Sequence, residues 1–165
     1  AARHGTNIRF LQGDFLHPLP AASADLLLCL GNSLPHLPSR EKLGTVLAHW
    51  LSLLTARGRV IIQLLNYERI IAAQKRIVNI RREDDRIIVR FYDFLQDAIQ
   101  FNILTIRERG STPEHSLRST RLTPFTGADI ESAAADAGFS QCRIAGTIEG
   151  TPFHAESTDT AIFLA

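Results

Sequence analysis

A small polar segment, Gly31-Asn32-Ser33, follows an apolar run and precedes His36. These residue types can do chemistry at close range: an amide orients a polar ligand, and an imidazole exchanges a proton near neutral pH. The run from Leu26 to Leu30 carries no charge, which is typical of a parallel strand covered on both faces. Ligands of open α/β sheets bind beside the carboxyl ends of such strands. The sequence therefore predicts a ligand site at Gly31-Asn32-Ser33, although an ordinary turn has the same composition.

Polar residues also follow two other predicted strands. The alternating stretch from Asn7 to Gln12 predicts a strand that ends just before Asp14. The apolar stretch from Val60 to Leu65 predicts a buried strand that ends at Asn66. Because the carboxyl ends of neighbouring parallel strands meet at one edge of a sheet, we expect the three strand ends to surround one hollow the size of a cofactor.

Two stretches have the apolar spacing of amphipathic helices. Ser39 is a suitable N-cap for the first, in which apolar residues recur at helical intervals from Leu43 to Leu54 before Gly58 breaks the chain. Thr126 is a suitable N-cap for the second, whose inner face runs from Ile130 to Ala137. Two closing strands are predicted at Cys142 to Ile148 and Ala161 to Leu164, joined by a loop (Gly150 to His154) that either contacts a ligand or is a plain connection.

Between these two helices, residues from about 75 to 124 follow a different pattern. Segments that alternate between apolar and polar residues are separated by short polar turns, which predicts three or four antiparallel strands. Because they interrupt an α/β pattern, we interpret them as an inserted β-meander or lid. Its arginines are typical of a solvated sheet face, and its aromatic side chains either cover a small organic acceptor or belong to the core.

The composition excludes several classes of function. Eighteen basic and 17 acidic side chains leave almost no net charge, so nothing favours a nucleic acid or an acidic membrane as partner. The apolar runs are too short to span a bilayer, and no secretory signal is visible. Cys29 and Cys142 lie in apolar runs, which favours free thiols in a reducing cytoplasm. The sequence contains no CxxC motif and no Cys/His cluster, which argues against a structural zinc site. We therefore predict no metal.

Taken together, the segments resemble the C-terminal two-thirds of a class I S-adenosylmethionine-dependent methyltransferase, with the glycine N-methyltransferase-like branch as the nearest likeness. The resemblance rests on three groups of residues that each follow a predicted strand: Gly13-Asp14-Phe15, Cys29 to Leu37, and Asn66-Tyr67. It implies a Rossmann-like α/β sheet that lacks its first strands and carries an inserted antiparallel β-meander.

The resemblance also implies a cofactor, S-adenosylmethionine, and the residues that would bind it. Asp14 would face the adenine amino group, because a carboxylate accepts a hydrogen bond from an amine, and Phe15 would close over the ring. The methionine end would be lined by Leu30, Gly31, Asn32 and Ser33. The alternative role for Asp14 is that of a turn residue after a strand.

Two departures from the family pattern limit what is implied. The glycine-rich loop and the acidic residue that holds the ribose are absent, and the chain contains no methionine, so we expect an N-terminally truncated fragment. Residues 1–165 would then form a single incomplete domain that is inactive without the upstream loop. Leu65 also stands where glycine-methylating enzymes carry a carboxylate-binding arginine, which argues against glycine as substrate.

A sulfonium methyl group is already activated, so the enzyme mainly aligns the acceptor and excludes water. His36 is the best placed residue to deprotonate or orient a small-molecule acceptor, although it would serve equally as a loop histidine bonded to the backbone. Tyr67 would supply a hydroxyl or a ring face. Two alternatives stay open, a non-catalytic partner-binding or regulatory module and a nicotinamide-dependent oxidoreductase. The oligomeric state is also open, with a homo-oligomer among the possibilities.

Overall fold

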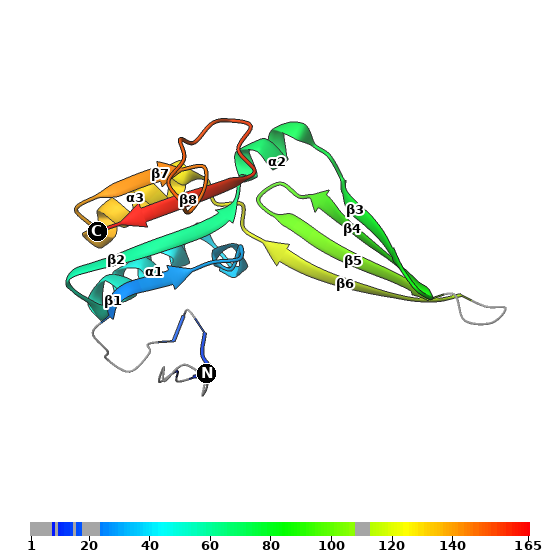
Figure 1. The fold of residues 1–165 in the computed structure, drawn as a ribbon, viewed down its shortest axis with the longest axis horizontal. Helices are drawn as coiled ribbons and strands as arrows, with labels where there is room; N and C mark the ends of the chain where they lie inside the picture. The colour runs from blue at the N-terminus through cyan, green and yellow to red at the C-terminus, as the bar shows by residue number, and fades with distance from the viewer. Residues whose placement is uncertain (1–7, 9, 15, 18–23, 108–112) are drawn as a thin grey trace.

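The computed structural model describes residues 8, 10–14, 16–17, 24–107 and 113–165, which form two four-stranded sheets and their helices (Figure 1). Sheet A has the strand order β1-β2-β8-β7, and sheet B has the order β3-β4-β5-β6. The strands are β1 (Ala24–Cys29), β2 (Leu54–Leu65), β3 (Ile77–Glu83), β4 (Arg86–Phe94), β5 (Ile99–Arg107), β6 (Glu114–Leu122), β7 (Cys142–Ala145) and β8 (Asp159–Leu164). The helices are the 3₁₀ helix η2 (Leu34–His36), α1 (Arg40–Leu53), α2 (Tyr67–Ala73) and α3 (Gly127–Ala137).

Sheet A and the two longer helices form the main body of the fold. β1 pairs with β2 in parallel, whereas β8 is antiparallel to both of its neighbours. The predicted N-cap of α1 is confirmed, because the Ser39 hydroxyl accepts a hydrogen bond from the Lys42 N–H. The buried side of α1, which includes Leu43, Leu47 and Trp50, belongs to the same core as the apolar side chains of β2 and β8. The predicted amphipathic spacing is therefore realised in the packing.

Two expectations about the start of sheet A are wrong. β1 is covered on one face only: Cys29 lies in the core, whereas Leu26 and Leu28 are 50% and 54% exposed. The structure describes residues 8 and 10–12 of the strand expected from Asn7 to Gln12, and these residues form no strand. Phe10 is 87% exposed. Alternation predicts which face a strand would bury, but a strand also needs a neighbour for its backbone hydrogen bonds, and this segment pairs with no described strand.

Gly58 does not separate α1 from the next strand, as the sequence suggested. The helix ends at Leu53, β2 begins at Leu54, and Gly58 lies inside the strand. A Cβ atom at Gly58 would lie 2.7 Å from the Ala24 carbonyl oxygen and 2.8 Å from the Leu54 Cβ atom. Glycine is therefore required by the close approach of the backbone at the beginning of β1.

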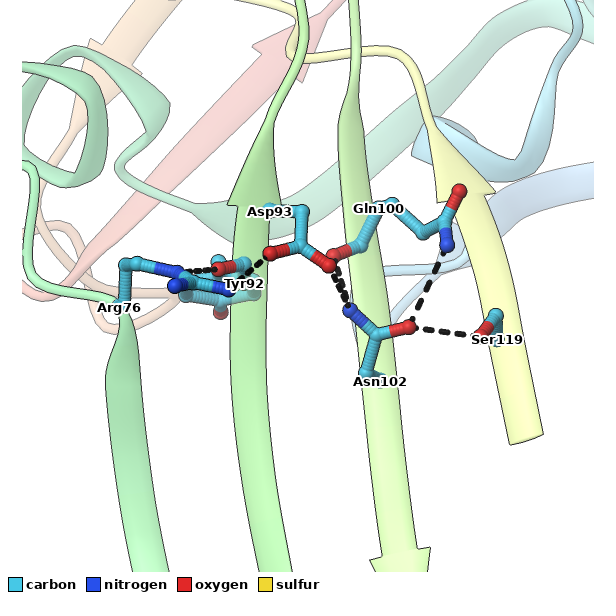
Figure 2. Close-up of polar contacts among 6 residues, drawn as sticks. All are labelled: Arg76, Tyr92, Asp93, Gln100, Asn102 and Ser119. Carbon is cyan, nitrogen blue, oxygen red and sulfur yellow. Dashed lines mark hydrogen bonds and ion pairs between the residues drawn. The ribbon is translucent and has the colours of Figure 1, made fainter. Parts of the chain in front are cut away.

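The predicted antiparallel insertion is confirmed, with four strands between Ile77 and Leu122. Sheet B projects away from sheet A, with the end of β3 and the beginning of β4 at its far end (Figure 1). Near the body, Asn102 is 1% exposed at the centre of a polar network (Figure 2). It donates to Asp93 at 2.8 Å and accepts from the Ser119 hydroxyl at 2.6 Å, and Asp93 also forms an ion pair with Arg76. Because a buried amide must find its partners, these bonds fix the register of β4, β5 and β6.

In α3, the predicted N-cap Thr126 is part of a complete capping box. The Thr126 hydroxyl accepts a hydrogen bond from the Asp129 N–H at 3.1 Å, and the Asp129 carboxylate accepts from the Thr126 N–H at 2.8 Å. Asp129 also forms an ion pair with Arg40 at the start of α1, so the same carboxylate links the two helices. Among the described helices, none has the length and apolar character needed to cross a membrane.

We expect Asp129→Ala to lower the free energy of unfolding by about 1 kcal/mol at neutral pH, because the capping box is lost. Partial burial opposes ionisation of Asp129, but the hydrogen bonds from Thr126 and the contact with Arg40 lower its pKa below the ordinary 3.8. The stabilisation is therefore present above pH 3.8 and is lost as the pH falls through the lowered pKa.

Urea unfolding at neutral and acid pH measures both effects. The matched change Asp136→Ala, on the exposed side of the same helix, should alter stability by less than about 0.5 kcal/mol. Equal losses in the two variants would contradict the capping role.

Candidate functional site

The loop after β1 makes a tight turn that is bonded to the end of β2. Gly31 and Asn32 both have left-handed backbone conformations, with φ of 71° and 60°. The Gly31 N–H donates to the Gln63 side-chain oxygen at 2.8 Å, and the Asn32 N–H donates to the Gln63 backbone oxygen at 3.2 Å. The Ser33 hydroxyl closes the turn by donating to the Leu30 carbonyl at 2.7 Å. Glycine and asparagine tolerate left-handed φ better than most residues, which explains this composition.

The side chain of Asn32 joins this loop to β2 and to α2. Its carbonyl oxygen accepts from the Leu65 N–H at 3.0 Å, and its amide nitrogen donates to the Tyr67 hydroxyl at 2.9 Å. Tyr67 is only 1% exposed, and burial raises its pKa to about 12. The phenol is therefore neutral near pH 7, and in this structure its hydroxyl holds Asn32. A catalytic role for Tyr67 stays a prediction.

Asn66, between β2 and α2, connects a second loop to the same end of sheet A. Its side-chain oxygen accepts from the Arg69 N–H at 3.1 Å and so caps α2. Its amide nitrogen donates to the carbonyl oxygens of Ala155 and Ser157 at 3.1 Å and 3.0 Å, in the loop that leads into β8. Asn66 thus holds the loop before β8 beside the end of β2.

A cavity lies beside this loop, along η2 and α1. It has a volume of about 750 Å³ and is lined by residues from the segment around Asp14, from η2 and from α1. Leu37 and Trp50 contribute buried apolar walls, whereas Asp14 and His36 are exposed. Asp14 accepts a hydrogen bond from the Leu16 N–H at 3.0 Å, as a turn residue does.

The structure thus separates residues that the sequence placed around one hollow. Asp14 and His36 line the cavity, but Gly31, Asn32 and Tyr67 are not among its lining residues. The expectation of three converging parallel strand ends is wrong for the described residues, because Asp14 follows no described strand. Leu30 is exposed beside the turn, and Phe15 lies outside the described residues.

Three further residues belong to this region, although no role in it was predicted for them. Gln63 holds Gly31 through its side chain, and no local pattern in β2 indicates such a partner. His17 and His49 line the cavity. No pattern in the sequence indicated this position for His49, which comes directly before the buried Trp50 on α1. Within the described part of the chain, no group of three or more His, Cys, Asp or Glu side chains is arranged to hold a metal ion.

A second cavity of about 670 Å³ lies between α2 and the loop before β8. Its lining includes Glu68, Arg69, Phe153 and Glu156, and Arg69 lies 3.7 Å from the Glu156 carboxylate. Phe153 of the Gly150 to His154 loop therefore faces a hollow, and contact of this loop with a ligand stays a prediction. Because β8 is antiparallel to β2, this cavity lies at the same end of sheet A as the Asn32 loop.

No known protein family and no curated protein matches the sequence of this chain. Its structure is similar to solved methyltransferases. An S-adenosylmethionine-dependent methyltransferase from Clostridium acetobutylicum has a TM-score of 0.80 at 13% identity, over 99% of this chain and 66% of that one. The CcbJ methyltransferase from Streptomyces caelestis has a TM-score of 0.78 at 19% identity (92% and 61%). The sugar N-methyltransferase KedS8 from Streptoalloteichus has a TM-score of 0.63 at 17% identity (92% and 60%).

These similarities show the fold. The chain has the Rossmann-like α/β fold of class I S-adenosylmethionine-dependent methyltransferases, together with an antiparallel sheet, as the sequence predicted. It spans 60% to 66% of the length of the three proteins. The glycine N-methyltransferase-like branch stays a prediction.

The Asn32 contacts predict a specific order of stability among variants. Asn32→Ala should lower the free energy of unfolding by about 2–4 kcal/mol, because the hydrogen bonds are lost and a left-handed φ is imposed on alanine. Asn32→Gly loses the same hydrogen bonds, but glycine adopts a left-handed φ without strain. This variant should therefore lose about 1 kcal/mol less of the free energy of unfolding than Asn32→Ala. Tyr67→Phe should cost about 1 kcal/mol.

Urea unfolding measured by circular dichroism tests this order. Ser52→Ala serves as the control, because the exposed Ser52 hydroxyl only donates to the His49 carbonyl within its own helix. An Asn32→Ala variant as stable as the control would show that the side chain does not hold the loop.

Proposed function

We propose that this chain belongs to an enzyme that transfers the methyl group of S-adenosylmethionine to a small-molecule acceptor. The observation that carries the proposal is the similarity of nearly the whole chain to an S-adenosylmethionine-dependent methyltransferase at a TM-score of 0.80. A fold alone does not define an activity, so the proposal also needs a site with suitable chemistry.

The cavity and the adjacent loop have groups that suit this cofactor. A volume of about 750 Å³ is sufficient for a nucleoside. The Asp14 carboxylate would accept a hydrogen bond from the adenine amino group, and the apolar surfaces of Leu37 and Trp50 would lie against the purine. The residues from Leu30 to Ser33 would line the methionine end, with Asn32 and Gln63 holding the turn in shape.

The cofactor supplies an activated methyl group, so the chain has to bind, orient and exclude water. His36, exposed at the cavity, would orient the acceptor or receive the proton that its nucleophile releases. Tyr67 and Asn32 would act as positioning residues, because their polar atoms bond to each other. Sheet B would contribute to acceptor selection.

The acceptor is a small organic molecule in this proposal, and glycine is not favoured. Leu65 at the end of β2 cannot form the bidentate contact that an arginine makes with a carboxylate. One of the similar structures is described as a sugar N-methyltransferase, which makes amino sugars a reasonable first panel of acceptors.

Calorimetric titration of S-adenosylhomocysteine into the full-length protein encoded by the gene tests the proposal. We expect binding, and we expect Asp14→Ala to weaken it by about 3- to 10-fold, the loss of one hydrogen bond. Asp25→Ala is the matched control: Asp25 is also exposed, but it lies near the start of β1, where it accepts a hydrogen bond from Thr55.

Absence of binding to the full-length protein would overturn the proposal and favour the alternative of a non-catalytic partner-binding module. If the Asp14 and Asp25 changes weakened binding equally, the protein would still bind S-adenosylhomocysteine, but the proposed contact between Asp14 and the cofactor would be contradicted.

A further inference from the structure

The 3₁₀ helix η2 brings His36 to the cavity, although its own hydrogen bonds hold it weakly. It has three residues. Its backbone bonds run from the His36 N–H to the Ser33 carbonyl at 3.1 Å and from the Leu37 N–H to the Leu34 carbonyl at 3.0 Å. Within the described residues, the Ser33 side chain does not cap this helix, and its hydroxyl donates to the Leu30 carbonyl instead. Because so short a 3₁₀ turn has poor hydrogen-bond geometry, its orientation depends on contacts from elsewhere in the fold.

The two carbonyl groups on either side of His36 receive their hydrogen bonds from one residue, Thr123. The Thr123 N–H donates to the Pro35 carbonyl at 2.8 Å, and the Thr123 hydroxyl donates to the Leu37 carbonyl at 2.7 Å. Pro35 and Leu37 are buried, and so is Thr123, which is 7% exposed. Because a buried carbonyl without a donor costs free energy, Thr123 fixes η2 at both of these positions.

Thr123 lies at the junction of sheet B and the body. β6 runs from the far end of the sheet toward the body, and Thr123 is the residue directly after it (Figure 1). The preceding residue, Leu122, is 4% exposed and pairs with Ile99 of β5. Thr123 therefore joins sheet B directly to the short helix that carries His36.

The segment that follows Thr123 is fixed as well. The Thr123 carbonyl accepts a hydrogen bond from the N–H of Phe125 at 2.9 Å, and the Phe125 side chain is fully buried in the core. The Arg40 guanidinium, at the start of α1, donates to the Pro124 carbonyl at 3.3 Å and lies 6.0 Å from the centroid of the Phe125 ring. A residue held from both sides in this way presents its hydroxyl in one direction.

The residues that Thr123 holds form part of the cavity wall. His36, Leu37 and Pro38 all line the cavity. In the proposed function, Leu37 lies against the purine and His36 orients the acceptor. Because a displacement of about 1 Å in a positioned group can cost a large part of binding or catalysis, the bonds behind this wall affect what the wall can do.

We infer that Thr123 is a positioning residue of the methyl-transfer site, which places Leu37 and His36 at the cavity and connects it to sheet B. Thr123 acts through these two residues, because it is not among the described residues that line the cavity. The inference rests on the proposed function, which assigns the cavity to S-adenosylmethionine.

Calorimetric titration of S-adenosylhomocysteine into the full-length protein and its variants tests the inference. Thr123→Val keeps the size of the side chain and removes the donor to the Leu37 carbonyl, so it should weaken binding by about 3- to 10-fold. Thr123→Ser restores the hydroxyl and should bind within about 2-fold of the unaltered protein.

Thr160→Val is the matched control for the loss of a buried hydroxyl. Thr160 lies on β8, is 3% exposed, and is not among the described residues that line the cavity. This change should leave the affinity for S-adenosylhomocysteine unaltered.

Amide hydrogen exchange followed by NMR shows whether the effect passes through η2. Thr123→Val should speed the exchange of the His36 and Leu37 amides by at least about 5-fold, because the short helix opens more often. Amides in the middle of β4 and β5 are the reference within the same sample and should change much less. Thr123→Ser should return the two η2 amides to their original rates.

Binding that Thr123→Val leaves unchanged would overturn the inference even if the two amides exchange faster, because Thr123 would then hold η2 without affecting the site. Failure of Thr123→Ser to restore binding, or an equal loss with Thr160→Val, would overturn it as well. If Thr123→Val does not fold, Thr123→Cys replaces it, because a thiol is a weaker donor, and unchanged binding would again contradict the inference. Absence of binding to the unaltered protein would instead overturn the proposed function and the inference together, so the two failures are distinguishable.

Discussion

The side chain of Asn32 connects three parts of this molecule that are distant in sequence. It belongs to the turn after β1, accepts a hydrogen bond from the backbone at the end of β2, and exchanges hydrogen bonds with Tyr67 at the start of α2. All of these groups are wholly or partly buried, so leaving any of them without a partner would cost more than the bond itself contributes. Asn32 consequently determines together how the loop runs, where β2 ends and where α2 begins. The chain then enters β3 within a few residues of α2.

The elements that could be predicted from the sequence are those determined by local chemistry. Ser39 and Thr126 are confirmed as helix caps because a cap is formed with residues only three positions away. The antiparallel insertion was predictable for a similar reason, since strict alternation and short polar turns define a meander without reference to the rest of the chain. In the site, the tight turn at Gly31 and Asn32 follows from the same kind of local signal.

What the sequence could not predict depends on long-range pairing. The stretch around Phe10 has the alternation of a strand, but whether it becomes one is decided by a neighbour and not by its own residues. The uncovered side of β1 could not be recognised from Leu26 and Leu28, because an apolar run has the same appearance whether one or both of its faces are packed. Gln63 became visible as the partner of Gly31 only once the parallel pairing of β1 and β2 was known.

The strand order of sheet A has a consequence for the order of folding. β8 lies between β2 and β7, although it follows every other described element along the chain. During synthesis on the ribosome, sheet A therefore stays divided until the polypeptide has been made as far as Leu164. Sheet B pairs only strands that are consecutive in sequence, so its loops close at low entropic cost and it can form earlier. A nascent chain of this protein would thus carry a formed hairpin array beside an open α/β sheet, and its partly exposed β2 would be the segment most in need of a chaperone.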